Sequence, residues 1–200
     1  EPVDFVTISS PWIGVRRPPE SLLNHAFHFF ATRVAGKTGV ELLLEDGQDG
    51  RTPKLVSMAM GKHLMALAQF KRRMVYGNIY YDLQVPYVTS LFSLFKNPFR
   101  NGNAVDIVYK EGFDLIVDMD QSTFVKPPES PEFAVSFSTD SQRIVLRDML
   151  KNLNTLECNK YPIMIHSWIG SHNQIIHNAW FQSGESIARH VGRRLREGFV

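Results

Sequence analysis

The chain contains a single cysteine, Cys158, among its 200 residues. One cysteine cannot close a disulfide within the chain, so the fold depends on packing rather than on covalent cross-links. This cysteine usage fits a reducing compartment, and we expect a cytoplasmic protein. A chain of this length normally forms one domain, at most two, and can bury a sizeable hydrophobic core.

Strong net charge and long apolar runs are also lacking. The formal net charge of +2 at neutral pH is too small to predict binding to nucleic acid. No segment approaches the run of about 18 apolar residues that a transmembrane helix requires, so we expect no transmembrane helix, and we expect no signal peptide. The sequence begins at Glu1, without an initiator methionine, and enters a predicted strand almost at once. We therefore expect a fragment of a longer protein.

Short segments rich in β-branched and aromatic residues alternate with helical patterns along the chain. The predicted strands are residues 3–9, 73–80 and 161–166. Helical spacing of apolar residues is found at 20–34, 53–70, 138–153 and 184–196, and a shorter helical piece is predicted at 42–44. This alternation predicts an α/β fold in which a parallel sheet is flanked by helices.

Two polar residues follow the second and third predicted strands. Asp82 directly follows the predicted strand 73–80, and His172 follows a loop after the predicted strand 161–166. Open α/β sheets place ligands and catalytic groups at the carboxyl ends of their strands. Asp82 alone can be a turn residue for local reasons, and His172 alone can be a loop histidine without a role. Together they have the acid-then-histidine order of an α/β-hydrolase triad.

Residues 96–138 are predicted to be an insertion that contains a β-hairpin. Its two strands are expected at 104–109 and 113–118, joined across Gly112. The acidic residues that follow are spaced as in a calcium loop, but Thr123 stands where such a loop needs glycine. We therefore predict no metal site, and no other motif predicts a cofactor.

Several short motifs follow one another in the order found in one enzyme family. They are Phe5-Val6-Thr7-Ile8-Ser9-Ser10-Pro11-Trp12-Ile13-Gly14-Val15-Arg16, Gly36 to Gly39, Phe70 through Asp82 to Ser90, Ser171 to Ile175, and Gly184 to His190. On these motifs the chain resembles the putative serine esterase family of lipase-like α/β-hydrolases, once known only as a domain of unknown function. The resemblance covers most of 5–99 and 139–192.

The resemblance implies that residues 1–200 are the C-terminal part of a single α/β-hydrolase domain. In that case they form the C-terminal portion of the hydrolase sheet, with flanking helices and the β-hairpin insertion at about 96–138. The acid and the histidine of a Ser-Asp-His triad then fall on Asp82 and His172. The implied activity is hydrolysis of carboxylic esters, with a lipid ester as substrate.

Two features depart from the family pattern. Trp12 stands where the family usually has histidine, and Gly-x-Ser-x-Gly occurs nowhere in the chain. Because the family carries that motif before its first matching strand, we expect the nucleophilic serine upstream of Glu1. The alternative is a non-catalytic module of the hydrolase fold that lacks the nucleophile and binds a partner or lipid.

The aromatic residues of two non-strand segments suggest contact with lipid. Residues 27–30 and 87–99 carry more phenylalanine than one apolar helix stripe needs, and Phe29 lies outside such a stripe. We expect these segments to form an apolar rim that gives peripheral contact with membranes or lipid droplets. The alternative is that the phenylalanines pack inside the protein.

Overall fold

The computed structural model describes residues 3–15, 29, 32–33, 35–47, 50–80, 82, 84–93, 97, 107–124, 140–165, 171–175 and 184–198. The elements in chain order are β1 (Asp4–Ile8), α2 (Gly36–Leu42), α3 (Lys54–Met58), α4 (Gly61–Ala68), β2 (Arg72–Asn78), α5 (Tyr87–Ser90), the 3₁₀ helix η2 (Gln121–Phe124), α6 (Asp140–Leu153), β3 (Asn159–Ile163), α7 (Ser171–Gln174) and α8 (Glu185–Arg196). The alternation of strands and helices that defines an α/β fold is confirmed.

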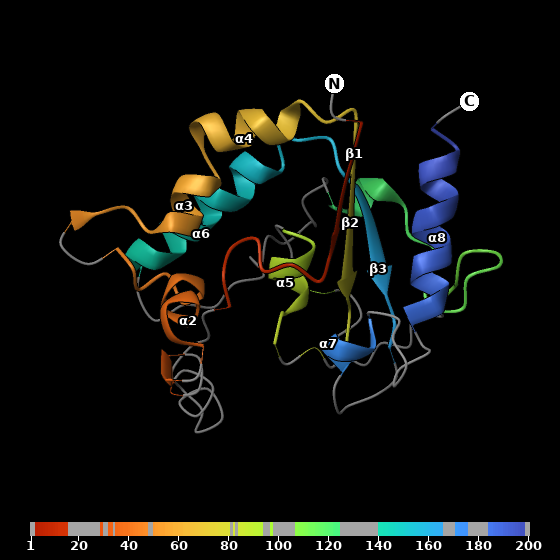
Figure 1. The fold of residues 1–200 in the computed structure, drawn as a ribbon, viewed down its shortest axis with the longest axis horizontal. Coiled ribbons are helices and arrows are strands. Elements are labelled where there is room, and N and C mark those ends of the chain that lie inside the picture. The colour runs from red at the N-terminus through yellow and green to blue at the C-terminus, as the bar shows by residue number, and fades with distance from the viewer. Residues whose placement is uncertain are drawn as a thin grey trace.

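The three strands form a parallel sheet in the order β1-β2-β3 (Figure 1). Asp4 pairs with Arg72 and Ile8 with Tyr76 between the first two strands, and Asn78 pairs with Ile163 between the last two. Parallel pairing with connecting helices brings the carboxyl ends of all three strands to the same edge of the sheet. The short helix α7 lies at this edge (Figure 1).

The central strand β2 has different neighbours on its two faces. Met74 and Tyr76 lie in one apolar cluster with Ile187 of α8, whereas Val75 lies in another with residues of α3 and α6. This division follows from the two-residue period of a strand, which points successive side chains to opposite faces. Burial on both faces accounts for the nearly unbroken apolar run from which this strand was predicted.

Helix α5 approaches β2 closely at Gly77. A β-carbon placed on Gly77 would lie 2.4 Å from the hydroxyl oxygen of Ser90 and 2.7 Å from Leu91, closer than real β-carbons come. Only glycine therefore fits at this point of the strand. This close approach fixes the position of the last residues of β2, from which the loop that contains Asp82 begins.

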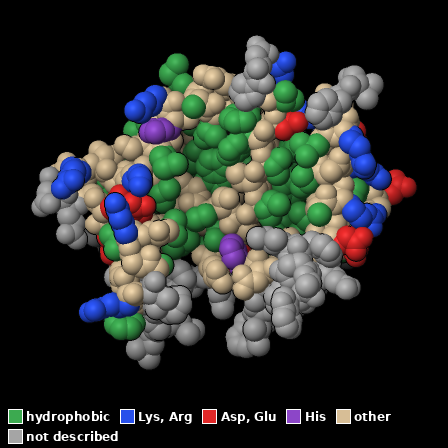
Figure 2. Space-filling model, in the orientation of Figure 1, with side chains coloured by type: hydrophobic (Ala, Val, Ile, Leu, Met, Phe, Trp, Pro, Cys, Tyr) green, Lys and Arg blue, Asp and Glu red, His purple; other side chains and the backbone are tan. Residues whose placement is uncertain are grey.

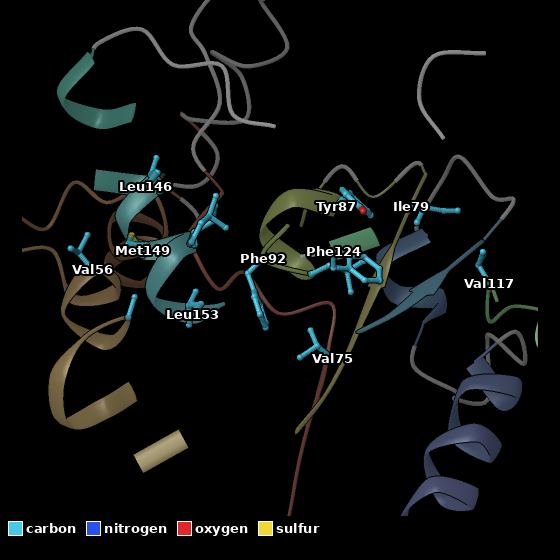
Figure 3. Packing of buried hydrophobic residues seen from close by; sticks show 14 of the residues in the cluster. Val56, Val75, Ile79, Tyr87, Phe92, Val117, Phe124, Leu146, Met149 and Leu153 are labelled. Carbon is cyan, nitrogen blue, oxygen red and sulfur yellow. The ribbon is translucent and has the colours of Figure 1, made fainter. Parts of the chain in front are cut away.

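The larger apolar cluster lies between the sheet and helices α3 and α6 (Figure 3). Phe92 is 1% exposed and packs edge-on against Trp12, with their ring centres 5.4 Å apart. Phe92 therefore belongs to the core and not to an apolar rim, so the packing alternative holds at this residue. Phe95 and Phe99 of the same segment lie outside the described residues. Phe29, in contrast, is 65% exposed.

The edge strand β1 is less covered than β2. All five of its residues are half-buried, and apolar side chains gather across the middle of the face turned toward the viewer in Figure 2. Among the described residues, β1 pairs only with β2. The same residues contain no helix that is both long enough and apolar enough to cross a membrane.

One predicted helix differs from the structure in its bounds. The helical piece predicted at 42–44 is instead α2, which begins at Gly36 and ends at Leu42. Its end is fixed by tertiary contacts, since the Val15 amide donates to the Leu42 carbonyl and Val15 packs on Leu43. A sequence period cannot reveal such contacts. The predicted helix at 20–34 lies largely outside the described residues.

The hairpin predicted around Gly112 is reduced to isolated bridges. Its turn is present, with Gly112 at a φ of 78°, but the described residues of the two predicted strands share a single antiparallel bridge, between Tyr109 and Val117. Ile116 forms a second bridge with Ile163, so this segment adds to the edge of β3 rather than standing as a separate ribbon. Residues 104–106 of the predicted hairpin lie outside the described residues.

Removing part of a core side chain should test the packing of α6 on the sheet. Leu150 is 1% exposed within the larger cluster, so Leu150→Ala should lower the free energy of unfolding by about 2–5 kcal/mol. The neighbouring Lys151 is exposed, and Lys151→Ala should change the free energy of unfolding by less than about 0.5 kcal/mol. Urea denaturation measures both. Equal small effects would mean that α6 is not part of the core.

Candidate active site at the carboxyl edge of the sheet

Three side chains from separate parts of the chain meet beyond the carboxyl ends of the strands. Ser9 directly follows β1, Asp82 lies in the loop after β2, and His172 lies in α7 after β3. His172 itself lies in the one-turn helix α7, and residues 167–170 of the loop predicted to deliver it lie outside the described residues. Because the strands are parallel neighbours, Asp82 contacts both Ser9, which lies 73 positions before it, and His172, which lies 90 positions after it.

The carboxylate of Asp82 accepts four hydrogen bonds. Its Oδ1 accepts the backbone N–H groups of Gln84, at 3.0 Å, and Val85, at 2.8 Å. Its Oδ2 lies 2.9 Å from Nδ1 of His172 and 2.9 Å from the hydroxyl oxygen of Ser9. The first pair is the local turn bonding that aspartate favours. The second pair crosses between strands, so the turn role and the contact with His172 coexist.

Electrostatics favour the ionised form of Asp82. The side chain is 1% exposed, and this burial raises the pKa of the carboxyl. Four interactions lower the pKa by more than burial raises it, so the net pKa is below the ordinary value. They are the hydrogen bond from His172, the hydrogen bond from the Val85 amide, the charge of protonated His172 and the hydrogen bond from the Ser9 hydroxyl. An ionised carboxylate can only accept hydrogen bonds. Asp82 is therefore held as an acceptor facing the imidazole.

The imidazole of His172 is oriented as a general base requires. Since Asp82 can only accept, Nδ1 of His172 carries a proton and, in the neutral ring, Nε2 keeps its lone pair. The His172 side chain is 26% exposed, whereas Asp82 beneath it is buried. A buried acid that orients a partly accessible imidazole is able to support proton transfer to and from a reacting group.

Ser9 is the site residue that sequence reasoning missed. The sequence places it at the end of the predicted strand 3–9 and within the first family motif, and predicts no role for its hydroxyl. Its φ of 47° places a non-glycine residue in the left-handed region, and it is 4% exposed. The available signal was its position at the end of a strand beside the strand that leads to Asp82.

Other histidines lie elsewhere or outside the described residues. His190 of α8 is buried beneath the sheet, where its Nδ1 lies 2.8 Å from the hydroxyl of Tyr76. Burial chiefly, with help from nearby cations, lowers the pKa of His190 to about 4, so it packs as a neutral ring. His63 of α4 is exposed. Within the described ranges, no three His, Cys, Asp or Glu residues are grouped so that they could hold a metal ion.

Trp12 has a packing role beside the site. Its ring makes edge contacts with Phe5 and Phe92, and the next amide, that of Ile13, donates to the Thr89 hydroxyl at 3.1 Å. The residue that departs from the family pattern thus fills space between β1 and α5.

Comparison with known proteins supports the resemblance for the first part of the chain. Residues 1–94 match the family described as putative serine esterase (DUF676), a match that includes Ser9 and Asp82 and ends before His172. The chain is 36% identical over 95 residues to the putative lipase YDL109C of Saccharomyces cerevisiae and 34% identical over 94 residues to the putative lipase ROG1 of the same yeast. No solved structure matches the chain.

The shared region is a small part of these relatives. It spans 47% of this chain and 14% of YDL109C, and 46% of this chain and 13% of ROG1. The resemblance to the serine esterase family is confirmed for residues 1–94.

The ionisation of Asp82 predicts how its contribution to stability depends on pH. Because its folded pKa lies below the ordinary 3.8, Asp82 stabilises the fold above pH 3.8, and this contribution is lost as the pH falls through the folded value. The difference in unfolding free energy between wild type and Asp82→Asn should be present at about pH 5 and shrink on further acidification. Denaturation at a series of pH values measures it. A difference that grows below pH 3.8 contradicts the assignment.

Proposed function

We propose that this chain, whose residues 1–94 match the serine esterase family, supplies the acid and the base of a lipid ester hydrolase. The observation that carries the proposal is the 2.9 Å contact between Nδ1 of His172 and Oδ2 of the buried Asp82. His172 is the general base and acid, and Asp82 holds its tautomer and stabilises the imidazolium that forms.

The first half of the reaction acylates a serine. Nε2 of His172 takes the hydroxyl proton as the serine oxygen bonds to the ester carbonyl carbon, whose π electrons move to the carbonyl oxygen. When the tetrahedral intermediate collapses, the ester C–O bond breaks and the leaving alcohol takes the proton from Nε2. Asp82 stays ionised throughout, in keeping with its low pKa.

The second half releases the acid. Water attacks the acyl-serine carbonyl carbon while Nε2 of His172 takes one of its protons, and collapse returns that proton to the serine oxygen. The products are a carboxylic acid and the free serine. Nε2 takes up and gives away a proton in each half of the reaction, which explains why the other nitrogen of the ring must stay bonded to a fixed acceptor.

We place the nucleophilic serine on a strand beside β1, in chain that precedes Glu1. Three observations support a further strand at this edge of the sheet. The residues of β1 are half-buried, β1 pairs with one strand among the described residues, and apolar side chains surround it on the surface. Residues 1–200 then form the C-terminal part of one α/β-hydrolase domain, with an insertion at about 96–138. A serine in a Gly-x-Ser-x-Gly turn on that strand would complete the triad.

Loss of either member of the pair should abolish turnover without unfolding the protein. Asp82→Asn and His172→Ala in the intact protein should each lower kcat on a short soluble ester by roughly a thousandfold or more, because the base loses its orientation or is removed. His63→Ala, which removes an exposed imidazole, is the matched control and should keep wild-type activity. Circular dichroism should be the same for all four proteins.

The contrary results of this experiment are distinct. Full activity of His172→Ala would sink the triad assignment. A wild-type protein that hydrolyses no ester, and whose reading frame contains no Gly-x-Ser-x-Gly serine, would favour the non-catalytic binding module.

The substrate in this proposal is a lipid ester met at a membrane or droplet surface. Two relatives named as putative lipases support it. Phe29 supports it too, since its side chain is 65% exposed and the Arg33 guanidinium lies 5.8 Å from its ring centre. An exposed aromatic side chain beside a cation is suited to an anionic lipid interface.

Phe29→Ser should reduce hydrolysis of dispersed long-chain lipid but leave hydrolysis of the short soluble ester unchanged. Met65→Ser removes an equally exposed apolar side chain from α4 and is the control. The rates of hydrolysis of both substrates, measured for wild type and the two variants, test this prediction. Equal loss on both substrates, or no loss on either, would exclude Phe29 as an interface residue.

A further inference from the structure

We propose that Ser9 is a positioning residue whose hydroxyl holds Asp82 Oδ2 in place for His172. The inference rests on the proposed function, because it assigns Ser9 a part in the same reaction. Ser9 acts through Asp82 and need not touch the substrate.

A backbone hydrogen bond and an unusual φ angle fix the position of Ser9. Its N–H donates to the Tyr76 carbonyl at 2.8 Å, which extends the pairing of β1 with β2 by one residue. Its φ of 47° then turns the chain away from the strand direction into the loop that carries Trp12. Glycine would adopt this conformation with less strain. What serine adds at this buried position is the hydroxyl directed at Asp82.

The hydroxyl restrains the one soft torsion of the acid. Rotation of a carboxylate about its last bond is broad, because the torsion joins sp³ and sp² carbons. The amides of Gln84 and Val85 hold Oδ1, which leaves Oδ2 to Ser9 and His172. Asp82 is 1% exposed, so bulk water is not at hand to replace a lost donor. With Ser9 in place, Oδ2 keeps one fixed donor while the imidazole gains and loses its Nε2 proton.

Ser9 is not the nucleophile, although Ser9, Asp82 and His172 follow one another in the order of a triad. A nucleophilic serine must give its proton to the imidazole nitrogen that faces away from the acid. The Ser9 hydroxyl instead donates to the carboxylate, at the same Oδ2 that Nδ1 of His172 contacts. The two groups share an acceptor, which is the arrangement of a support and not of an attacking group.

Two substitutions separate the hydroxyl from the backbone. Ser9→Ala removes the hydroxyl and keeps the strained φ, whereas Ser9→Gly removes the hydroxyl and relieves the strain. Ser10→Ala removes the neighbouring hydroxyl and is the matched control. The first readout is the titration of the Asp82 carboxyl carbon by NMR in the intact protein, assigned with Asp82→Asn. The second is kcat and KM on a short soluble ester.

The hydroxyl role predicts the same result for both Ser9 variants. The Asp82 titration midpoint should move upward in Ser9→Ala and Ser9→Gly alike, and kcat should fall by roughly tenfold with KM unchanged, the effect of losing one hydrogen bond to a charged group. Ser10→Ala should match wild type in both. A purely structural role would leave Ser9→Gly like wild type, and either that result or an unmoved midpoint in both variants overturns the proposal.

The two readouts also separate this inference from the proposed function. If wild type hydrolyses no ester, the proposed hydrolase function fails, and the NMR titration alone then decides whether Ser9 holds Asp82. If wild type is active but the midpoint is unmoved in both Ser9 variants, the hydrolase stands and the role of Ser9 is rejected.

Discussion

The buried carboxylate of Asp82 is the group on which the carboxyl edge of the sheet depends. Its four hydrogen bonds join the residue after β1, the turn after β2 and the helix after β3. A carboxylate that is 1% exposed would be costly to bury without such partners. The same bonds lower its pKa and make it a permanent acceptor, so one buried charge both closes this edge and orients His172.

That arrangement requires the strands to be fixed in register. Ile8 opposite Tyr76 places Ser9 beside the end of β2, and Asn78 opposite Ile163 places the next strand end alongside. Gly77 lets α5 pack against β2 and so fixes the path from the strand to Asp82. The core clusters on the two faces of β2 hold this register, because a slip of one residue would exchange the sets of side chains that α6 and α8 cover.

Much of this framework could be predicted from the sequence. The strands were predictable because β-branched, aromatic or other apolar residues cluster in or beside each of them, and the α/β class followed from their alternation with helices. The proximity of Asp82 and His172 was predictable because both follow neighbouring parallel strands. The position of Ser9 at a strand end placed it near the site, but its contact with Asp82 could not be predicted, since that contact depends on strand register and on a φ of 47° that no residue pattern specifies.

Other features depended on tertiary contacts in the same way. The sequence left open whether the phenylalanines of 87–99 pack or form a rim, and Phe92 proves to be buried against Trp12. The predicted hairpin is reduced to bridges because Ile116 pairs with Ile163 at the edge of β3. Lys160, a charged residue, is 4% exposed in β3, where its ammonium donates to the Asn154 amide oxygen at 2.7 Å. Burial lowers the pKa of Lys160 to about 7, an environment that composition could not indicate.

In the proposed hydrolase, Asp82 and His172 activate a serine of the intact protein. Reaction with a fluorophosphonate ester, which labels only an activated serine, followed by mass spectrometry of the labelled peptide, tests it most directly. We expect a label on the serine of a Gly-x-Ser-x-Gly turn, and loss of that label in His172→Ala with the fold unchanged. A wild-type protein that takes no label, or a label that persists in His172→Ala, would contradict it.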